Sequence, residues 1–409
     1  MRNLFCIIIV IIYSVTLSAQ ERITLLFVGD LMQHDAQIKA AQTNKGYDYS
    51  DCFRHVKKEI SKADIAIGNL EVTLGGKPYR GYPSFSAPDE FLYAIKDAGF
   101  DVLLTANNHC LDRGKKGLER TAHLLDSLKM PFTGTYRTPE DRQQRYPLLI
   151  EKNGFRIALL AYTYDTNGLR PSEPNIVNYI DTVQIKGDIQ AARRMKPDAI
   201  IACMHWGLEY HSLPHSSQKK LADWLIDLGV DHIIGSHPHV VQPMEVRQDQ
   251  HHPSRHLIVY SLGNFISNMS RENTDGGAMV KLELKKLWGI TRMESCSYSL
   301  IWTSRPILGK KTSYEVYPAS FINQSVQNEE FTPFQRFLNN TRELYQKYNI
   351  GIKEYFFWKK VGERFGDSKK SRTFASISKR KAQQTNMVTI VQSVRASDCG
   401  SECRGFESH

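Results

Sequence analysis

The sequence contains neither a long membrane-spanning run nor a biased composition. The apolar run at residues 4–15 is shorter than the about 20 residues that a spanning helix needs. Glycine and proline are not in excess, with 26 Gly and 16 Pro in 409 residues, which excludes collagen-like and low-complexity chains. With 41% hydrophobic and 23% charged residues, the chain has the composition of a globular protein with a sizeable core.

Cysteine is scarce, and the charge is only mildly unbalanced. Of seven cysteines, the four in the body of the chain are widely separated and form no C-x-x-C metal pair, so we expect isolated buried thiols: Cys52, Cys110, Cys203 and Cys296. The net charge is +10, and much of the basic excess lies within residues 368–409. The body carries no basic-aromatic motif, which excludes nucleic acid as the expected partner.

The N-terminal segment has the three parts of a secretory signal peptide. Arg2 precedes the apolar run, and small residues follow at 17–20. The pattern predicts a signal peptide at residues 1–19 and a secreted or periplasmic protein. An uncleaved anchor that holds the N-terminus at the cell envelope is the alternative.

The body alternates short β-rich apolar runs with helical stretches. Strands are predicted at residues 23–28, 63–68, 102–105, 155–162, 199–204, 232–235 and 257–261. Helices are predicted at residues 52–63, 88–98, 117–129, 218–228 and 331–348. This alternation favours an α/β sandwich of mixed β-sheets flanked by helices. After residue 284 the pattern weakens.

Polar clusters follow most of the predicted strands directly. They are GDLMQH at 29–34, NLE at 69–71, NNHCLDRG at 107–114, HWGLEY at 205–210, SHPH at 236–239 and GNF at 263–265. Sites in α/β proteins form outside the carboxyl ends of strands, where such loops converge. We therefore expect the clusters to form one common site.

The residue types in these clusters favour a divalent metal. The candidate ligands are carboxylates, amide oxygens and imidazoles: Asp30, His34, Glu71, Asn108, His205, His237 and His239. Mixed oxygen and nitrogen ligands without thiolate suit Mn, Zn or Fe, as one ion or as two that share a carboxylate. Each cluster alone is more simply explained as a helix cap or a turn. Only the six clusters taken together make a metal site the better interpretation. The two histidines of SHPH are expected on one face of an extended segment.

The ordered series GDLMQH, GNLEVTL, NNHCLDRGKKGLERT, HWGLEY, GSHPHVVQPME and YSLGNF resembles the bacterial poly-γ-glutamate capsule-synthesis (CapA-type) family. The resemblance covers about residues 23–280. That family is related to the calcineurin-like metallophosphoesterases, which implies a metallophosphoesterase-like sandwich of two mixed sheets. Together with the residue pattern farther along the chain, we predict a CapA-like domain at 20–300, a helical extension at 301–366 and a basic tail, expected to be disordered, at 367–409.

The resemblance assigns roles to individual residues. Asp30, Asn108, His205, His237 and His239 match metal ligands, and Asn69 or Glu71 occupies the region of the bridging carboxylate. His109 matches the acid that protonates the leaving group, and Asp112 is placed to orient its imidazole. The remaining candidates for substrate binding are Asn69, Arg113, Trp206, Glu209 and Asn264.

Two positions depart from the phosphoesterase pattern. Met32 stands where that pattern has a histidine, and Asn69 stands where it has an aspartate. His34 and Glu71 are the candidate substitutes. The departures leave three outcomes open, namely one metal ion, an altered pair, or none.

Three functions fit these observations. The first is a CapA-like role in synthesis, export or attachment of an anionic capsule polymer, with a metal-dependent hydrolase site and the capsule machinery as partner. The second is a metal-dependent phosphoesterase that acts on a small or lipid-linked phosphorylated substrate. The third is a non-catalytic module that binds the polymer. Sequence alone leaves open whether the chain is an enzyme.

Overall fold

A computed structural model describes residues 21–248, 254–306, 313–321 and 328–357. The predicted signal peptide and basic tail lie outside these residues. Among the helices of the described residues, none has both the length and the apolar content that crossing a membrane requires.

Near-continuous apolar runs allow the central strands to be buried on both faces. In β1 (Glu21–Leu31), Ile23, Leu25 and Phe27 face one core, whereas Leu26 and Val28 face another. Such strands form two mixed sheets, and the first contains nine strands within the described residues. Its order is β18 (Glu315–Pro318), β17 (Ile290–Ser304), β16 (Gly276–Leu287), β1, β4 (Ile65–Leu70), β5 (Val102–Leu104) and β6 (Phe132–Thr133), with β15 (Asn264–Ile266) beside β1 and β19 (Lys353–Glu354) beside β17.

The second sheet contains six strands within the same described ranges. Its order is β13 (Met244–Gln248), β14 (Arg255–Val259), β12 (His232–Ser236), β11 (Ala199–His205), β9 (Phe155–Thr163) and β8 (Leu148–Lys152). Two short ribbons pair β2 (Gln42–Thr43) with β3 (Gly46–Tyr47) and β7 (Thr135–Tyr136) with β10 (Ile176–Val177). In each large sheet the central strands are parallel and the outer ones include antiparallel pairs.

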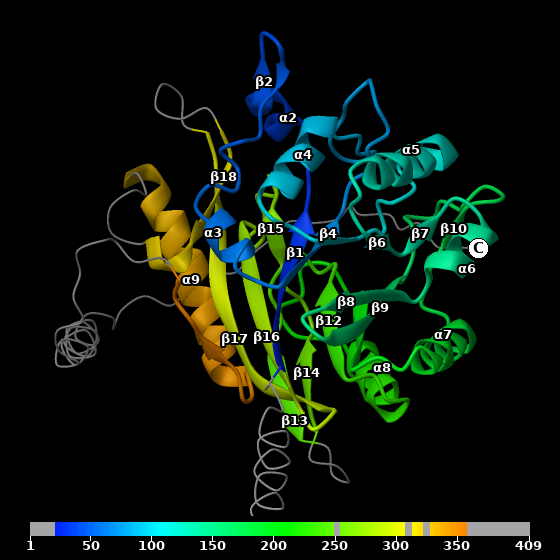
Figure 1. Ribbon diagram of the computed structural model, residues 1–409. Coiled ribbons are helices and arrows are strands. Elements are labelled where there is room, and N and C mark those ends of the chain that lie inside the picture. Colours follow the sequence, from blue (N-terminus) through cyan, green and yellow to red (C-terminus); the bar gives the residue numbers. More distant parts are fainter. Residues whose placement is uncertain (1–20, 249–253, 307–312, 322–327, 358–409) are drawn as a thin grey trace, which may run out of the picture. The chain divides into compact units, whose positions relative to one another are not determined.

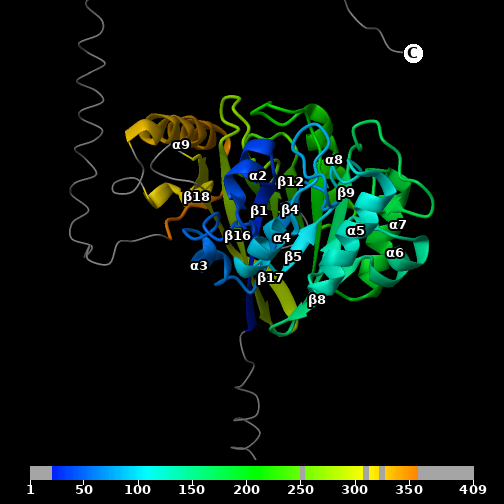
Figure 2. The ribbon, with the colours of Figure 1, turned by 90° about the horizontal axis from the view of Figure 1, so that it is seen from above.

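Helices flank the two sheets (Figures 1 and 2). They are α2 (Asp35–Ala41), α3 (Lys57–Ile60), α4 (Asp89–Asp97), α5 (Gly114–Ser127), α6 (Pro139–Arg145), α7 (Thr182–Arg194), α8 (Ser216–Asp227) and α9 (Asn328–Tyr348), with a 3₁₀ turn, η1, at Ala319–Phe321. Apolar residues of α3, α4 and α5 pack on the first sheet, and those of α7 and α8 pack on the second. The largest core lies between the sheets and also receives Phe334, Phe337 and Leu338 of α9. The predicted α/β sandwich of two mixed sheets flanked by helices is therefore confirmed.

Two local predictions differ from the structure. Residues 51–56 form successive turns instead of the first half of a helix, with Cys52 and Val56 donating to carbonyls three residues back. These turns bury Cys52, Phe53 and Val56 as well as a helix would. After residue 284 the chain does not lose its regularity but completes the long antiparallel pair β16–β17. Because β17 runs through residue 300, the predicted boundary there falls inside a strand.

The cysteine prediction holds for three of the four body thiols. Cys52, Cys110 and Cys203 are buried, and Cys296 is half-buried.

Acid should destabilise the second sheet through His232. Burial, aided by nearby His256, lowers the pKa of His232 from 6.5 to about 3, and its Nδ1 accepts a hydrogen bond from Leu257 N at 3.1 Å. The unfolded chain therefore binds the extra proton first, and stability falls as the pH drops from 6.5 towards 3, by up to about 1.4 kcal/mol per pH unit. We expect the free energy of urea unfolding to depend less on pH in His232→Gln. An unchanged pH dependence would exclude His232 as a source of the acid sensitivity.

Candidate metal centre

Asp30 reaches the site because β1 is irregular at its end. The register of β1 with β4 shifts between Val28 and Asp30, a bulge that redirects the following side chain. The bulge brings β1 against the turn before β15, where Asp30 N donates to Gly263 O at 3.1 Å. A Cβ on Gly29 would lie 1.8 Å from that oxygen, so only glycine fits there.

The ends of four parallel strands bring the other polar clusters to the same place. Glu71 follows β4, and Asn108 and His109 follow β5. His205 ends β11, and His237 follows β12. Parallel strands carry their carboxyl ends to one edge of a sheet, so clusters far apart in sequence converge. The strand order therefore brings these clusters to one place in the structure.

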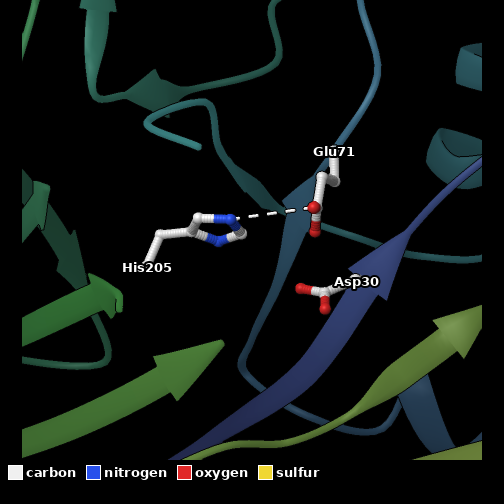
Figure 3. A group of neighbouring side chains, drawn as sticks. All are labelled: Asp30, Glu71 and His205. Atoms are coloured by element: carbon white, nitrogen blue, oxygen red, sulfur yellow. Dashed lines mark ion pairs between the residues drawn. The ribbon is translucent and has the colours of Figure 1, made fainter. Parts of the chain in front are cut away.

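Three of the predicted ligands form the centre of the cluster. Ligand atoms of Asp30, Glu71 and His205 lie within 4.8 Å of one another, and all three residues are buried. Figure 3 shows their side chains pointing toward one another from β1, from the end of β4 and from β11. His205 Nε2 lies 3.7 Å from Glu71 Oε1 and 2.8 Å from Asn108 Oδ1.

The two histidines after β12 complete the cluster from one side. His239 Nε2 lies 3.7 Å from Glu71 Oε1, and His239 Nδ1 lies 3.3 Å from Asp30 Oδ2. The ring centroid of His237 lies 4.8 Å from that of His205. His237 and His239 have φ angles of 99° and 58°, so they do not alternate along an extended segment as expected. They converge because both adopt the strained left-handed backbone that is common at functional sites.

Several atoms at the centre of the cluster are buried without a hydrogen-bond partner. They are Asp30 Oδ2, Glu71 Oε1 and His237 Nδ1. Leaving buried carboxylate oxygens and an imidazole nitrogen unpaired is costly unless a cation satisfies them. Oxygen and nitrogen donors of this kind suit a divalent transition metal. The residues present therefore fit the metal that the sequence predicts.

Burial and the close contacts within the cluster shift the pKa values of its groups in both directions. Burial, together with the negative charge of Asp30, raises the pKa of Glu71 well above its ordinary value. Burial and neighbouring imidazoles lower the pKa of His205, and they lower that of His237 to about 3, so both rings are neutral and able to bind a metal. Burial opposes charge on His239 as well, but the Asp30 carboxylate, 3.3 Å away, outweighs it and raises the pKa of His239.

His109 and Asp112 form a pair beside the cluster. His109 Nδ1 lies 2.8 Å from Asp112 Oδ2, and both side chains are buried. Phe85 N also donates to Asp112 Oδ2 at 2.8 Å, which fixes the carboxylate. These two contacts hold the Asp112 carboxylate and the His109 imidazole against each other.

His34 lies near the cluster, but its imidazole contacts residues outside the cluster. It is the N-cap of α2, where its Nδ1 lies 3.1 Å from Gln37 Oε1 and 3.3 Å from Asn268 N. Burial is the largest cause that lowers its pKa to about 4. Of the two candidate substitutes for the departures from the phosphoesterase pattern, Glu71 is in the central group and His34 is not.

Three of the predicted substrate-binding residues have structural partners instead. Asn69 Nδ2 donates to Asp30 Oδ1 at 2.8 Å and to Glu71 Oε2 at 3.2 Å, so the amide lies between the two carboxylates. Asn264 Oδ1 lies 3.0 Å from His239 Nδ1 and orients that ring. Trp206 is buried in the second sheet's outer core, where its indole N–H donates to Tyr260 O at 2.9 Å.

Arg113 and Glu209 are partly exposed. Arg113 is the N-cap of α5, and the aliphatic part of its side chain lies beside Gly75 and Gly117. The charge of Glu209 acts on Glu71 and on His239, which places it near the mouth of the site. Tyr164, 43% exposed, lies with its ring 4.4 Å from His237 and forms part of the same mouth.

Sequence reasoning missed Asn167, which lies in the loop after β9. Its Oδ1 accepts a hydrogen bond from Asn108 Nδ2 at 3.2 Å, while Asn108 Oδ1 faces His205. This contact fixes which end of the Asn108 amide points into the cluster. No motif marks the position, because only the path of the loop brings Asn167 there.

Replacing Asn167 should weaken metal binding without unfolding the protein. In Asn167→Ala the Asn108 amide keeps only its contact with His205, and we expect Mn²⁺ affinity, measured by calorimetry, to fall about tenfold. Asn153→Ala is the matched control, since both asparagines have a φ of 51° and Asn153 is exposed. Equal Mn²⁺ affinity in the two variants would contradict the role of Asn167.

Comparisons with known proteins agree with the motif series. A family model described as bacterial capsule synthesis protein PGA_cap matches residues 24–269. The chain is 30% identical over 276 residues to capsule biosynthesis protein CapA of Bacillus anthracis, covering 65% of this chain and 64% of that one. It is 28% identical over 279 residues to PGA biosynthesis protein CapA of Bacillus subtilis, covering 64% and 67%. The match to the first relative thus spans less than two thirds of its length.

Solved structures with a similar fold include two enzymes. The calcineurin-like phosphoesterase YfkN from Bacillus subtilis has a TM-score of 0.42 at 16% identity, covering 79% of this chain and 98% of that chain. The NAD nucleotidase NadN of Haemophilus influenzae has a TM-score of 0.46 at 12% identity, covering 90% and 69%.

Proposed function

Because the chain belongs to the bacterial capsule synthesis protein family, we propose that it acts in the synthesis, export or attachment of an anionic capsule polymer. We propose further that its buried cluster is the site of a metal-dependent hydrolase. The observation that carries this second proposal is the set of unpaired buried atoms on Asp30, Glu71 and His237. Two carboxylate oxygens and an imidazole nitrogen that lack partners in one buried cluster favour a cation that would satisfy them.

The metal would be held by residues from both sheets. They are Asp30, Glu71, Asn108, His205, His237 and His239, and Glu71 Oε1 is placed 3.7 Å from two imidazoles. A divalent ion bound there would supply Lewis acidity and would lower the pKa of a water molecule. Mn, Zn and Fe all accept this donor set.

The chain's own residues supply the remaining chemistry. Asn69 keeps the two carboxylates apart, and Asn264 and Ser236 orient His239 and His205 through contacts of 3.0 Å. His109 would donate its proton to the departing group of the substrate, with Asp112 holding the ring in place. Bond cleavage at a phosphoester or at an amide of the polymer would use the same arrangement.

A substrate panel tests the proposal. Phosphomonoester, phosphodiester and γ-glutamyl substrates are assayed with and without Mn²⁺. Metal-dependent cleavage of any of them supports a hydrolase, and the preferred class separates the polymer from a small or lipid-linked phosphoester. Complete inactivity in protein that binds no metal would contradict the hydrolase and favour a module that only binds the polymer.

We also propose that the protein is exported. The support is the basic start and short apolar run of residues 1–19, which lie outside the described residues. Detection of the chain with its N-terminus at residue 20 in the extracytoplasmic fraction would test this.

A further inference from the structure

The hairpin between β16 and β17 ends in three exposed apolar side chains, which we call the apolar tip. Leu287 pairs with Ile290 across the two strands, and Trp288 lies in the turn between them. The exposed fractions of Leu287, Ile290 and Trp288 are 41%, 52% and 69%, so none of these side chains packs into a core. Single exposed apolar residues are common on protein surfaces, but a group of them at one turn favours an interaction surface.

The backbone of the turn is unfavourable for a tryptophan. Trp288 and Gly289 have φ angles of 55° and 75°, so both central residues of this two-residue turn are left-handed. Such turns usually contain asparagine or aspartate followed by glycine, because these residues tolerate that backbone. A bulky side chain there is strained, and strained positions are concentrated at functional sites. The turn therefore keeps an exposed tryptophan at a cost in stability.

Basic residues flank the apolar tip. Residues 285–292 contain Lys285, Lys286 and Arg292 and no acidic residue. Lys286 Nζ lies 2.7 Å from Asp198 Oδ2, which offsets its charge, whereas Arg292 is exposed. Tryptophan is enriched at the boundary between a bilayer and water, and lysine and arginine are attracted to anionic headgroups. The composition of the hairpin end therefore fits the surface of an anionic membrane.

The apolar tip lies at the end of the first sheet where the N-terminal apolar run enters the domain. Glu21, the first residue of β1, pairs with Lys286, which directly precedes Leu287 (Figure 1). Residues 16–20 separate β1 from the apolar run at 4–15, and five residues span at most about 18 Å. A bilayer that receives the apolar run, either during export or as an anchor site, is therefore within reach of the apolar tip.

A second copy of the chain fits this surface less well than a bilayer does. A stable protein interface buries about 800 Å² on each partner and involves roughly 20 to 30 residues of each. The apolar tip offers three apolar residues at one turn. A bilayer needs no complementary shape, and it can accommodate a single exposed tryptophan at the level of the headgroups.

We propose that the apolar tip inserts Trp288 into the headgroup region of an anionic phospholipid bilayer. Asp30 follows Glu21 by nine positions along β1, which corresponds to about 30 Å at the rise of a strand. The metal centre therefore lies at the far end of β1 from the membrane contact. The membrane contact holds the domain at the bilayer surface and does not depend on the reaction at the metal centre.

Quenching of tryptophan fluorescence by brominated lipid tests the proposal in the full chain. Vesicles of brominated phosphatidylcholine and phosphatidylglycerol should lower the emission by about one fifth, because Trp288 is one of five tryptophans. In Trp288→Phe, which keeps an aromatic ring but removes the reporter, this quenching should disappear. Trp224→Phe is the matched control: Trp224 is half-buried on α8, so the quenching should persist in that variant.

A second pair of variants keeps the reporter and changes the surface around it. Leu287→Asp places a charge in the apolar tip, and we expect at least half of the quenching to be lost. Val183→Asp is its control, because Val183 is 81% exposed on α7, and it should be quenched like the wild type. Absence of quenching in the wild type, or its persistence in Trp288→Phe, overturns the proposal. A change of oligomeric state in Leu287→Asp without lipid, measured by ultracentrifugation, would also overturn it and would identify a second copy as the partner.

Discussion

Asp30→Asn is expected to lose bound metal while the metal-free protein remains folded. Asp30 Oδ2 is buried, lacks a hydrogen-bond partner and lies 3.3 Å from His239 Nδ1, so its charge is positioned for a cation. We expect the affinity for Mn²⁺ to fall about 100-fold or more, because changes to outer partners alone cost 10- to 100-fold. Elemental analysis of protein purified without chelator, compared with wild type, measures the loss.

The stability of the metal-free variant separates a ligand from a structural residue. Without metal, the charge of Asp30 repels Glu71 but attracts His239, so removing that charge should change the unfolding temperature little. Asp188→Asn is the matched control: Asp188 is a buried acid that accepts bonds from Arg142 at 2.7 and 2.9 Å. That variant should lose stability and keep its metal. A stability loss with full metal content in Asp30→Asn would refute the ligand role.

His109→Ala is expected to slow hydrolysis by about 10² to 10⁴, the usual contribution of a general acid. The loss should depend on the leaving group. An alkyl alcohol must be protonated as it departs, whereas 4-nitrophenolate leaves readily without a proton. We therefore expect a large loss for the alkyl ester and a small one for the 4-nitrophenyl ester, measured as kcat/KM in the same buffer.

Two further variants define the role of His109. Asp112→Asn keeps the size of the side chain but weakens its interaction with the imidazole. We therefore expect kcat/KM to fall about tenfold, with the same dependence on the leaving group. His123→Ala, on the exposed side of α5, is the control and should be fully active. Equal losses for both esters in His109→Ala would mean that His109 does not protonate the leaving group.

The central strands could be predicted from sequence because they are buried on both faces. Runs such as residues 199–204 have no polar interruption, and the structure places a strand at Ala199–His205. Strands β16 and β17 were harder to predict because one face of each is partly exposed in their outer halves. The alternation of Lys281, Leu282, Glu283 and Leu284 is nevertheless the pattern of a half-buried strand and could have revealed β16.

The candidate ligands could likewise be named from sequence, since carboxylates, amides and imidazoles directly after strands are visible in the chain. The residues that each candidate ligand contacts could not be predicted from the sequence. From the sequence, His34 and Glu71 are equally good candidates for the missing metal ligands. In the structure His34 caps α2, whereas Glu71 follows β4 and lies in the cluster. Trp206 follows His205 directly, yet the alternation of side chains at the end of a strand turns it into the core.

The sequence by itself determined the α/β class, the order of the polar clusters and the kinds of donor atom, because these depend on local patterns of polarity. Tertiary structure alone decided which donors meet. Parallel strands bring Asp30 and His205 together across 175 positions, left-handed backbone turns His237 and His239 inward, and a distant loop supplies Asn167. Such contacts depend on strand order and loop path, and a linear pattern of residue types carries neither.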